Sequence, residues 1–195
     1  MSANAQYLFN PDITAEPVVI QYLADCPQHI PTLAAWIYDY WGKQYRMHSV
    51  REQIDAISER LYRNRIPLAF VALSGSHPIG TASLKIQEMT TRKQFYHWLG
   101  SVFVIPEFRR RGIGGALVTR CETKAAEFGV SDLFLHSPDQ EAFYRKLNWI
   151  PVERSSYYDM QVVIMKKTLA SPVFRGMRSY PESNREDKLP TFPRF

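Results

Sequence analysis

The stretch EFRRRGIGGAL, residues 107–117, places three consecutive arginines directly before three glycines that fall within four residues. It follows the apolar run WLGSVFVIP (98–106) and leads into a segment, 113–128, whose apolar positions have helical spacing. A glycine-containing turn between a strand and a helix presents free backbone N–H groups at the positive end of the helix dipole. Arginine side chains add charged donors that suit phosphates. The stretch therefore predicts an anion-binding loop, with a solvated basic turn as the simpler alternative.

Two better-known phosphate-binding loops do not match this stretch. A P-loop requires GxxxxGK[ST], and the chain contains no such motif. A dinucleotide-binding turn requires GxGxxG early in a βαβ unit, with an acidic residue about 20 residues later. The segment GIGGAL lacks the third glycine and lies in the middle of the chain. Neither nucleotide-binding motif explains the arginines and glycines.

Length and composition indicate one folded domain. The chain has 195 residues, of which 45% are hydrophobic and 22% charged. No apolar run approaches the roughly 20 residues that span a bilayer, and the first residues lack a secretory signal pattern, so we expect a cytoplasmic protein without a membrane partner. Cys26 and Cys121 lack metal-site spacing, which predicts no metal and favours two reduced thiols, although a single bridge between them stays open. The net charge of +5 suits nucleic acid, an acidic substrate or a phosphorylated ligand.

Hydrophobic periodicity predicts strands and helices in mixed order, which indicates one α/β or α+β layer domain with a partly antiparallel sheet. Apolar or alternating runs predict strands at residues 17–23, 67–73, 81–89, 98–106 and 132–138, and two more within 152–169. Helical spacing predicts helices at residues 29–41, 50–64, 113–128 and 139–148. Residues 1–170 form the expected domain. Residues 171–195 have four prolines and no periodicity, and we expect a weakly ordered or docked tail.

Two polar sets within these elements are interpreted as surface. In the helix predicted at 50–64, the charged face is expected to be solvated and consists of Arg51, Glu52, Asp55, Glu59 and Arg60. In the strand predicted at 81–89, Ser83, Lys85 and Gln87 lie on the side opposite to the apolar residues. The segment 90–97 is expected to be a loop.

Three motifs together resemble the GCN5-related N-acetyltransferase (GNAT) family, over roughly residues 17–169. RRRGIG (109–114) matches [RQ]xxGx[GA], the pyrophosphate-binding loop of that family. VFVIPEF (102–108) looks like the strand that leads to this loop, and EAFYRKLNWIPV (141–152) is similar to the second signature. The resemblance implies a mixed, mostly antiparallel sheet of about seven strands flanked by four helices. It also implies that the sheet splays between its fourth and fifth strands, where acetyl-CoA would bind.

The resemblance also implies which residues bind acetyl-CoA. Backbone groups of the strand at 98–104 would pair with the pantetheine arm, and backbone amides of the arginine-glycine loop would hold the pyrophosphate. The implied cofactor-binding residues are Val102, Phe103, Val104, Arg109, Arg110, Arg111, Gly112, Ile113, Gly114, Gly115, Ala116 and Tyr144.

Catalytic roles follow from the same resemblance. Tyr144 matches the tyrosine that protonates the leaving thiolate, although packing in the core is the alternative for this residue. The strand at 98–104 carries no carboxylate to act as a general base. His136 is a base by its ordinary pKa near 6.5, with Glu88 and His97 as alternatives. The family's usual asparagine before the tyrosine is missing, and Asp139 stands nearby.

The implied function is transfer of an acetyl group from acetyl-CoA to a primary amine, which could belong to a small amine, an amino acid or a protein. Arg92 and Lys93 in the loop at 90–97 argue against a cationic polyamine. The competing interpretations are a non-catalytic acyl-CoA sensor and a basic nucleic-acid-binding module. The concentration of basic residues at one helix start favours a compact phosphate ligand over nucleic acid. The oligomeric state, including a homodimer, stays open.

Overall fold

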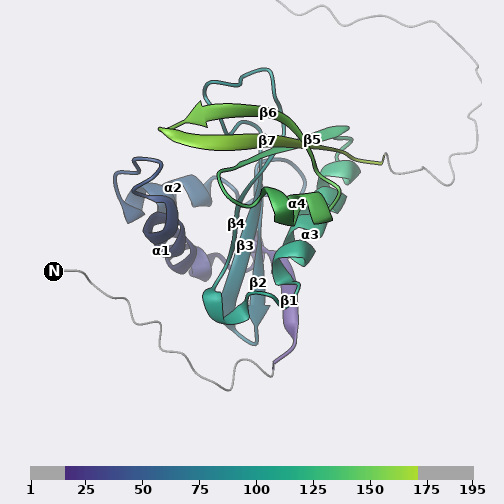
Figure 1. Ribbon diagram of the computed structural model, residues 1–195. Coiled ribbons are helices and arrows are strands. Elements are labelled where there is room, and N and C mark those ends of the chain that lie inside the picture. The colour runs from purple at the N-terminus through teal and green to yellow at the C-terminus, as the bar shows by residue number, and fades with distance from the viewer. Residues whose placement is uncertain (1–15, 171–195) are drawn as a thin grey trace, which may run out of the picture.

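The computed structural model describes residues 16–170, and the tail expected at 171–195 lies outside the described residues. Seven strands form one sheet with the order β1-β2-β3-β4-β5-β7-β6. In Figure 1, α1 and α2 lie on one side of the central strands, and α3 and α4 lie on the other. The strands are β1 (Val18–Tyr22), β2 (Leu68–Ser74), β3 (His77–Lys85), β4 (Trp98–Val104), β5 (Asp132–Ser137), β6 (Ile150–Tyr157) and β7 (Met160–Thr168). The α-helices are α1 (Ile30–Trp41), α2 (Val50–Ser58), α3 (Ile113–Glu127) and α4 (Glu141–Lys146).

This architecture confirms the predicted fold class. The pairs β1–β2, β2–β3, β3–β4, β5–β7 and β6–β7 are antiparallel, and β4–β5 is parallel. Three boundaries differ from the expectation by four residues or more. The second helix ends at Ser58 rather than at residue 64, and the third strand runs from His77 to Lys85 rather than from residue 81 to residue 89.

The sheet separates two apolar clusters, because side chains of successive strand residues point to opposite faces. On β2, Leu68, Phe70 and Ala72 join the cluster under α3, whereas Ala69 and Val71 join the cluster under α1 and α2. Strand β2 is buried along its whole length, and so it forms the centre of the fold. Cys26 and Cys121 are buried and unpaired, one in each cluster, so the two thiols form no bridge.

Strand β4 contains one extra residue relative to β3. Thr81 pairs with Phe103, but Ser83 pairs with Gly100, so two steps on β3 correspond to three on β4. Such a bulge reverses which face the following residues point to. Leu99 therefore joins the cluster under α3, whereas Phe103, four residues later, joins the cluster under α1. Ser101, in the bulge, has a left-handed backbone with φ of 52°.

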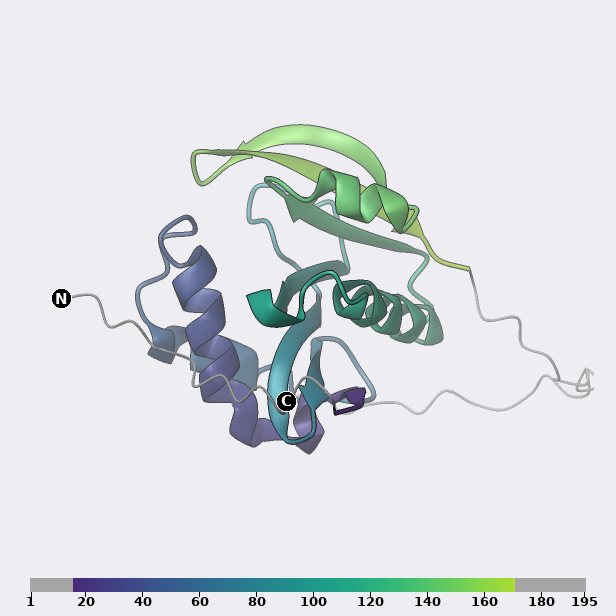
Figure 2. The same ribbon diagram turned by 60° about the horizontal axis from the view of Figure 1, so that its bottom comes forward.

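Strands β4 and β5 diverge immediately after they meet. Their only paired position is Trp98 with Phe134, at the start of β4. Figure 2 shows β5, β6 and β7 as one layer, separated from β1 to β4, with α3 beside the opening. The predicted splay between the fourth and fifth strands is thereby confirmed. Within residues 16–170, no helix is long and apolar enough to cross a membrane.

Candidate active site

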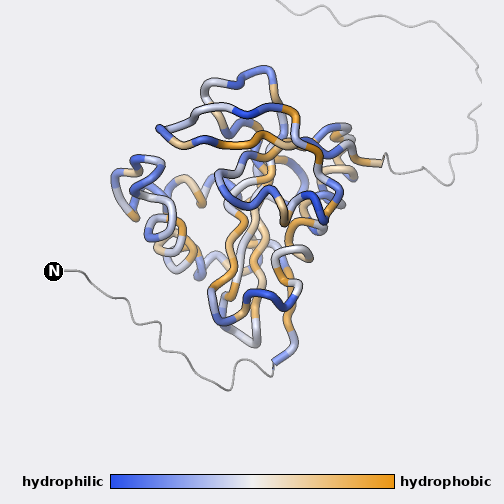
Figure 3. The backbone as a smooth tube through the Cα atoms, in the orientation of Figure 1, coloured by the Kyte–Doolittle hydropathy of each residue, from blue (hydrophilic) through white to orange (hydrophobic). Residues whose placement is uncertain are grey.

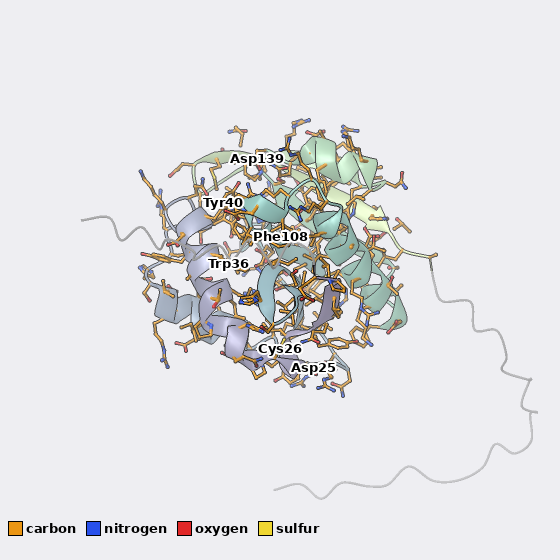
Figure 4. All side chains as sticks on the ribbon, turned by 90° about the horizontal axis from the view of Figure 1, so that it is seen from below. Asp25, Cys26, Trp36, Tyr40, Phe108 and Asp139 are labelled. Atoms are coloured by element: carbon orange, nitrogen blue, oxygen red, sulfur yellow. The ribbon has the colours of Figure 1, made fainter. Side chains whose placement is uncertain are left out.

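A cavity of about 740 Å³ occupies the space between the diverging strands. One part is lined by the end of β4 and the loop before α3, and the other part lies between the segment after α1, the ends of β3 and β5, and the β6–β7 turn. Figure 4 shows Tyr40 of α1, Phe108 of the loop before α3 and Asp139 of the β5–α4 loop around this opening. The cavity therefore brings together segments from both layers of the sheet.

The loop before α3 is held by two left-handed residues. Gly112 has φ of 81° and Arg110 has φ of 61°. Gly112 is the N-cap of α3, so the amides of Ile113, Gly114 and Gly115 begin the helix without partners in the preceding turn. The Ala116 amide, in contrast, already donates to the Gly112 carbonyl at 3.0 Å. The amides of Ile113, Gly114 and Gly115 at the cavity wall therefore remain to receive an anion.

The three arginines have different positions. Arg109 donates from Nε to the Val104 carbonyl at 2.8 Å, and its guanidinium lies 5.6 Å from the Phe103 ring. Arg110 lines the cavity. Arg111 lies over Phe108, 4.9 Å from the ring centroid. In Figure 3 the segment linking β4 to α3 is hydrophilic against the hydrophobic central strands. Of these three arginines, Arg109 and Arg110 thus border the cavity.

The three glycines of the loop differ in whether their position requires glycine. An added Cβ on Gly112 would meet no atom within 4 Å, so this position requires glycine for its left-handed backbone. An added Cβ on Gly114 would lie 3.5 Å from Phe143, and one on Gly115 would lie 3.7 Å from Leu147. Both distances are ordinary van der Waals contacts, so the packing of α4 and of the residues after it on α3 leaves room for a Cβ at Gly114 and Gly115.

Tyr144 lies on α4 and is 8% exposed. Its ring packs against Phe143 and Trp149, with centroid separations of 4.9 and 6.1 Å, and it also lines the cavity. Burial, followed by the nearby Asp139 and Cys121, raises the pKa of the Tyr144 phenol. The phenol consequently stays protonated at neutral pH, the form that can donate a proton.

His136 lies near the end of β5 in an aromatic enclosure. Its ring is 5.5 Å from Tyr157, 5.9 Å from Tyr45 and 6.2 Å from Trp98, measured between centroids. Its Nδ1 atom is buried and has no hydrogen-bond partner within residues 16–170. Burial lowers the pKa of His136, and Glu88 partly opposes that shift. The imidazole is therefore neutral at pH 7 and has one nitrogen free to accept a hydrogen bond or a proton.

Glu88 follows β3 and pairs with Lys85, whose Nζ lies 2.5 Å from Glu88 Oε2. The pair packs on Gly100, where an added Cβ would come within 3.0 Å of the carboxylate. Burial favours the neutral acid, but Lys85, His136 and Arg60 together outweigh it and hold the pKa of Glu88 below its usual range. Glu88 is therefore an ionised counter-charge, which makes it a weaker proton acceptor than the unpaired imidazole.

Arg60 and Lys85 line the cavity although sequence reasoning missed both. Arg60 was expected on the solvated face of a helix, and that expectation is wrong. Helix α2 ends at Ser58 because Leu61 pairs with Leu68 and the Arg60 carbonyl accepts a hydrogen bond from Ala69. No local pattern in the sequence signals this turn. For Lys85 the signal was present, since strand alternation placed it with Ser83 away from the apolar side.

Two other predicted residues lie elsewhere. His97 is at the closed end of the splay, where its carbonyl accepts a hydrogen bond from the Phe134 amide at 2.9 Å. Arg92 pairs with Glu153 of β6 and donates to Ser155 at 2.8 Å. Arg92 therefore says nothing about the charge of the cavity, whose lining contains both cations and carboxylates: Arg46, Arg60, Lys85, Arg109, Arg110, Glu52, Glu88 and Asp139. Within the described part of the chain, no cluster of His, Cys, Asp and Glu could hold a metal ion.

Comparison with solved structures shows the same fold. An aminoglycoside 6'-acetyltransferase type Ii aligns with a TM-score of 0.61 at 19% identity, covering 77% of this chain and 96% of that one. An aminoglycoside 6'-N-acetyltransferase complexed with coenzyme A gives 0.60 at 18% identity, covering 77% and 96%. The protein yncA from Salmonella typhimurium, with its cofactor acetyl-CoA, gives 0.62 at 13% identity, covering 80% and 96%.

Sequence comparison identifies the family. No curated protein matches this chain. The family model of the acetyltransferase (GNAT) family matches residues 30–149, which is more than half of the 195 residues. The match contains the arginine-glycine loop, His136 and Tyr144, and it agrees with the sheet order and with the parallel, diverging pair β4–β5. This chain therefore belongs to the acetyltransferase (GNAT) family.

Proposed function

We propose that this acetyltransferase moves the acetyl group of acetyl-CoA to a primary amine by direct attack on the thioester. The observation that carries the proposal is the set of free amides at the start of α3, which opens into the same cavity as Tyr144 and His136. Structures of the same fold hold coenzyme A or acetyl-CoA, which supports assigning this ligand to the loop.

The residues present fit the pyrophosphate and pantetheine groups of acetyl-CoA. The amides of Ile113, Gly114 and Gly115 face the cavity together with Arg110, and an anion there gains hydrogen bonds and the helix dipole. The edge of β4 that faces β5 is unpaired between Leu99 and Val104 among the described strands, apart from the bond from Arg109 to the Val104 carbonyl. Backbone groups at Val102 and Phe103 can therefore pair with the amides of a pantetheine arm.

His136 is the proposed general base. The attacking amine must lose a proton, and the neutral imidazole on the cavity wall has one unprotonated ring nitrogen that can accept it directly or through one water molecule. Glu88, which is ionised and electrostatically coupled to His136, stabilises the imidazolium that results. In this assignment His136 accepts the proton and Glu88 stabilises the charge without becoming protonated.

Tyr144 is the proposed general acid. As the amine nitrogen forms its bond to the acetyl carbon, the bond from that carbon to sulfur breaks and the sulfur needs a proton. Burial keeps the Tyr144 phenol protonated, and the same exclusion of water raises the proton affinity of a thiolate. Backbone N–H groups on the open edge of β4 are the proposed donors to the oxygen that becomes negative during the attack.

A thermal-shift titration tests the cofactor assignment. Saturation at 100 times the dissociation constant stabilises a protein by about 2.7 kcal/mol, or roughly 5 to 10 °C in this size range. We expect this rise with acetyl-CoA and not with NAD or ATP. It should weaken in Arg110→Ala, which removes a cavity-lining charge, and persist in the matched Arg111→Ala, whose side chain lies over Phe108. Absence of a shift at millimolar acetyl-CoA would refute the proposal.

A second measurement separates the enzyme from a non-catalytic sensor on the same fold. Release of free CoA thiol in the presence of an amine panel reports turnover, whereas a sensor binds acetyl-CoA without releasing thiol. Basic residues spread along one face would favour nucleic acid instead, but here Arg109 and Arg110 concentrate at one helix start.

A further inference from the structure

Arg60 occupies an unusual position at the wall of the cavity. Its backbone is fixed on the edge of the sheet, since its amide donates to the Ile57 carbonyl at 2.9 Å and its carbonyl accepts from Ala69 at 3.1 Å. The side chain crosses toward β3 and β4, where Nη1 lies 3.4 Å from the hydroxyls of Ser83 and Ser101. Ser101 is the bulge residue of β4, so the irregularity that opens the splay also turns a hydroxyl toward Arg60.

The guanidinium of Arg60 forms no salt bridge within residues 16–170, although Glu88 and Glu59 act on it electrostatically. Both hydroxyl contacts are long for hydrogen bonds. The nearest buried carboxylate, Glu88, is paired at 2.5 Å with Lys85. Arg60 and Lys85 therefore share one close anion, Glu88, and in the described part of the chain neither Glu59 nor the cavity-lining Glu52 forms a salt bridge with Arg60. An arginine held away from bulk water without a paired anion is costly, so its guanidinium is ready to bind one.

We infer that the amine acceptor carries a carboxylate, and that Arg60 binds this group. The inference rests on the proposed function, because it names the acceptor of that reaction. Arg60, Glu88 and His136 line one cavity, so a molecule held at Arg60 by its carboxylate can present its amine to His136. A guanidinium binds a carboxylate through two parallel hydrogen bonds, and Arg60 has no such partner among the described residues.

Matched pairs of acceptors test the inference in the full-length protein. One arm compares free amino acids with their amides, and a second compares short peptides that begin with Asp or Glu with the same peptides that begin with Asn or Gln. Spermidine serves as the cationic acceptor. We expect kcat/KM to be about 10- to 100-fold higher for the carboxylate member of at least one arm, and the arm that responds identifies a free amino acid or a peptide as the source.

Variants of Arg60 assign this preference to the guanidinium. Arg60→Met should remove the preference mainly by raising KM for the carboxylate acceptor, with kcat retained, and Arg60→Lys should restore part of it. The exposed Arg51, which does not line the cavity, provides the control, so Arg51→Met should keep the wild-type preference. Stabilisation by acetyl-CoA should be unchanged in all three variants, which shows that the fold and the cofactor loop are intact. A structural role for Arg60 would instead lower the melting temperature and the rates on all acceptors equally.

Two outcomes overturn the inference while leaving the proposed function in place. In the first, acetyl-CoA binds but the amides or spermidine are better acceptors than the carboxylates. In the second, Arg60→Met keeps the preference for carboxylate acceptors. If no acceptor in the panel causes release of CoA thiol, a thermal-shift titration with succinate tests for a carboxylate site without turnover. Stabilisation of the wild type that is lost in Arg60→Met supports a carboxylate site, and equal curves for both proteins refute it.

Discussion

Two glycines in the loop before α3 should respond to the same substitution with opposite signs. Gly112 has a left-handed backbone, with φ of 81° and ψ of −7°, and a Cβ there would touch nothing within 4 Å. The cost of Gly112→Ala is therefore conformational, about 1–2 kcal/mol. Alanine also reduces the conformational freedom of the unfolded chain, which offsets roughly 0.4–1 kcal/mol of this cost. We expect a net loss of about 1 kcal/mol in the free energy of unfolding.

Gly114 lies in the first turn of α3 with a helical backbone. Alanine is favoured over glycine in a helix by roughly 0.5–1 kcal/mol. The new Cβ would lie 3.5 Å from Phe143, which is an ordinary van der Waals contact. Gly114→Ala should therefore leave stability unchanged or raise it by up to about 1 kcal/mol. In this size range the two variants should melt on opposite sides of the wild type, about 2–4 °C below and up to about 4 °C above.

Urea denaturation followed by tryptophan fluorescence, with a ligand-free melting curve, provides the measurement. Each variant serves as the control for the other, because they introduce the same methyl group two residues apart. An unchanged Gly112→Ala protein would mean that the loop does not need its left-handed residue. A strongly destabilised Gly114→Ala protein would mean that α4 packs more closely on α3 than the contact with Phe143 allows.

Three further predictions concern the catalytic and charged residues. Tyr144→Phe should lower kcat by roughly 10²- to 10⁴-fold in a thiol-release assay while leaving the acetyl-CoA thermal shift intact, and a fully active variant would exclude the general-acid role. Burial lowers the pKa of His136 in the fold, so the unfolded chain binds the proton first as the pH falls below about 6.5. Stability of the wild type, measured in urea from pH 7 to 5, should therefore decline more steeply than that of His136→Asn, and equal slopes for the two proteins would contradict the burial of His136. Glu88→Gln should lower the free energy of unfolding by about 3 kcal/mol, because it leaves buried cations without an anion. Lys85→Met should lower it by less, because Glu88 keeps other positive neighbours. The reverse order in urea denaturation would contradict this charge balance.

Much of the fold was predictable because its signals are local. The apolar run of β2 and the helical spacing of α3 depend on residues close together in the chain, and both elements were located within a residue or two. The end of α2 was not predictable, because the pairing of Leu61 with Leu68 interrupts a sequence whose apolar spacing could continue as a helix. The bulge at Ser101 was equally hidden, since an extra residue on one strand leaves no mark in its composition.

In the candidate site, too, the residues in contiguous motifs were predictable, and those brought in by long-range pairing were not. The arginine-glycine loop and Tyr144 belong to contiguous motifs, so the sequence alone indicated them. Arg60 approaches the cavity from a turn whose course depends on long-range pairing, and its proximity to Ser101 joins positions 41 residues apart. Only the structure shows that Arg110 lines the cavity whereas Arg111 lies over Phe108, because the sequence gives no basis for distinguishing two adjacent arginines.

The single paired position between β4 and β5 has a consequence for cooperativity. With Trp98 and Phe134 as the only paired position between them, the layer of β5, β6 and β7 and the layer of β1 to β4 depend on side-chain packing for their connection. Local opening at such a seam costs less free energy than global unfolding. A ligand that pairs with both strands would make the sheet continuous, so amide hydrogen exchange should slow in β6 and β7, far from any contact with that ligand. The co-substrate would then complete the fold as well as take part in the reaction.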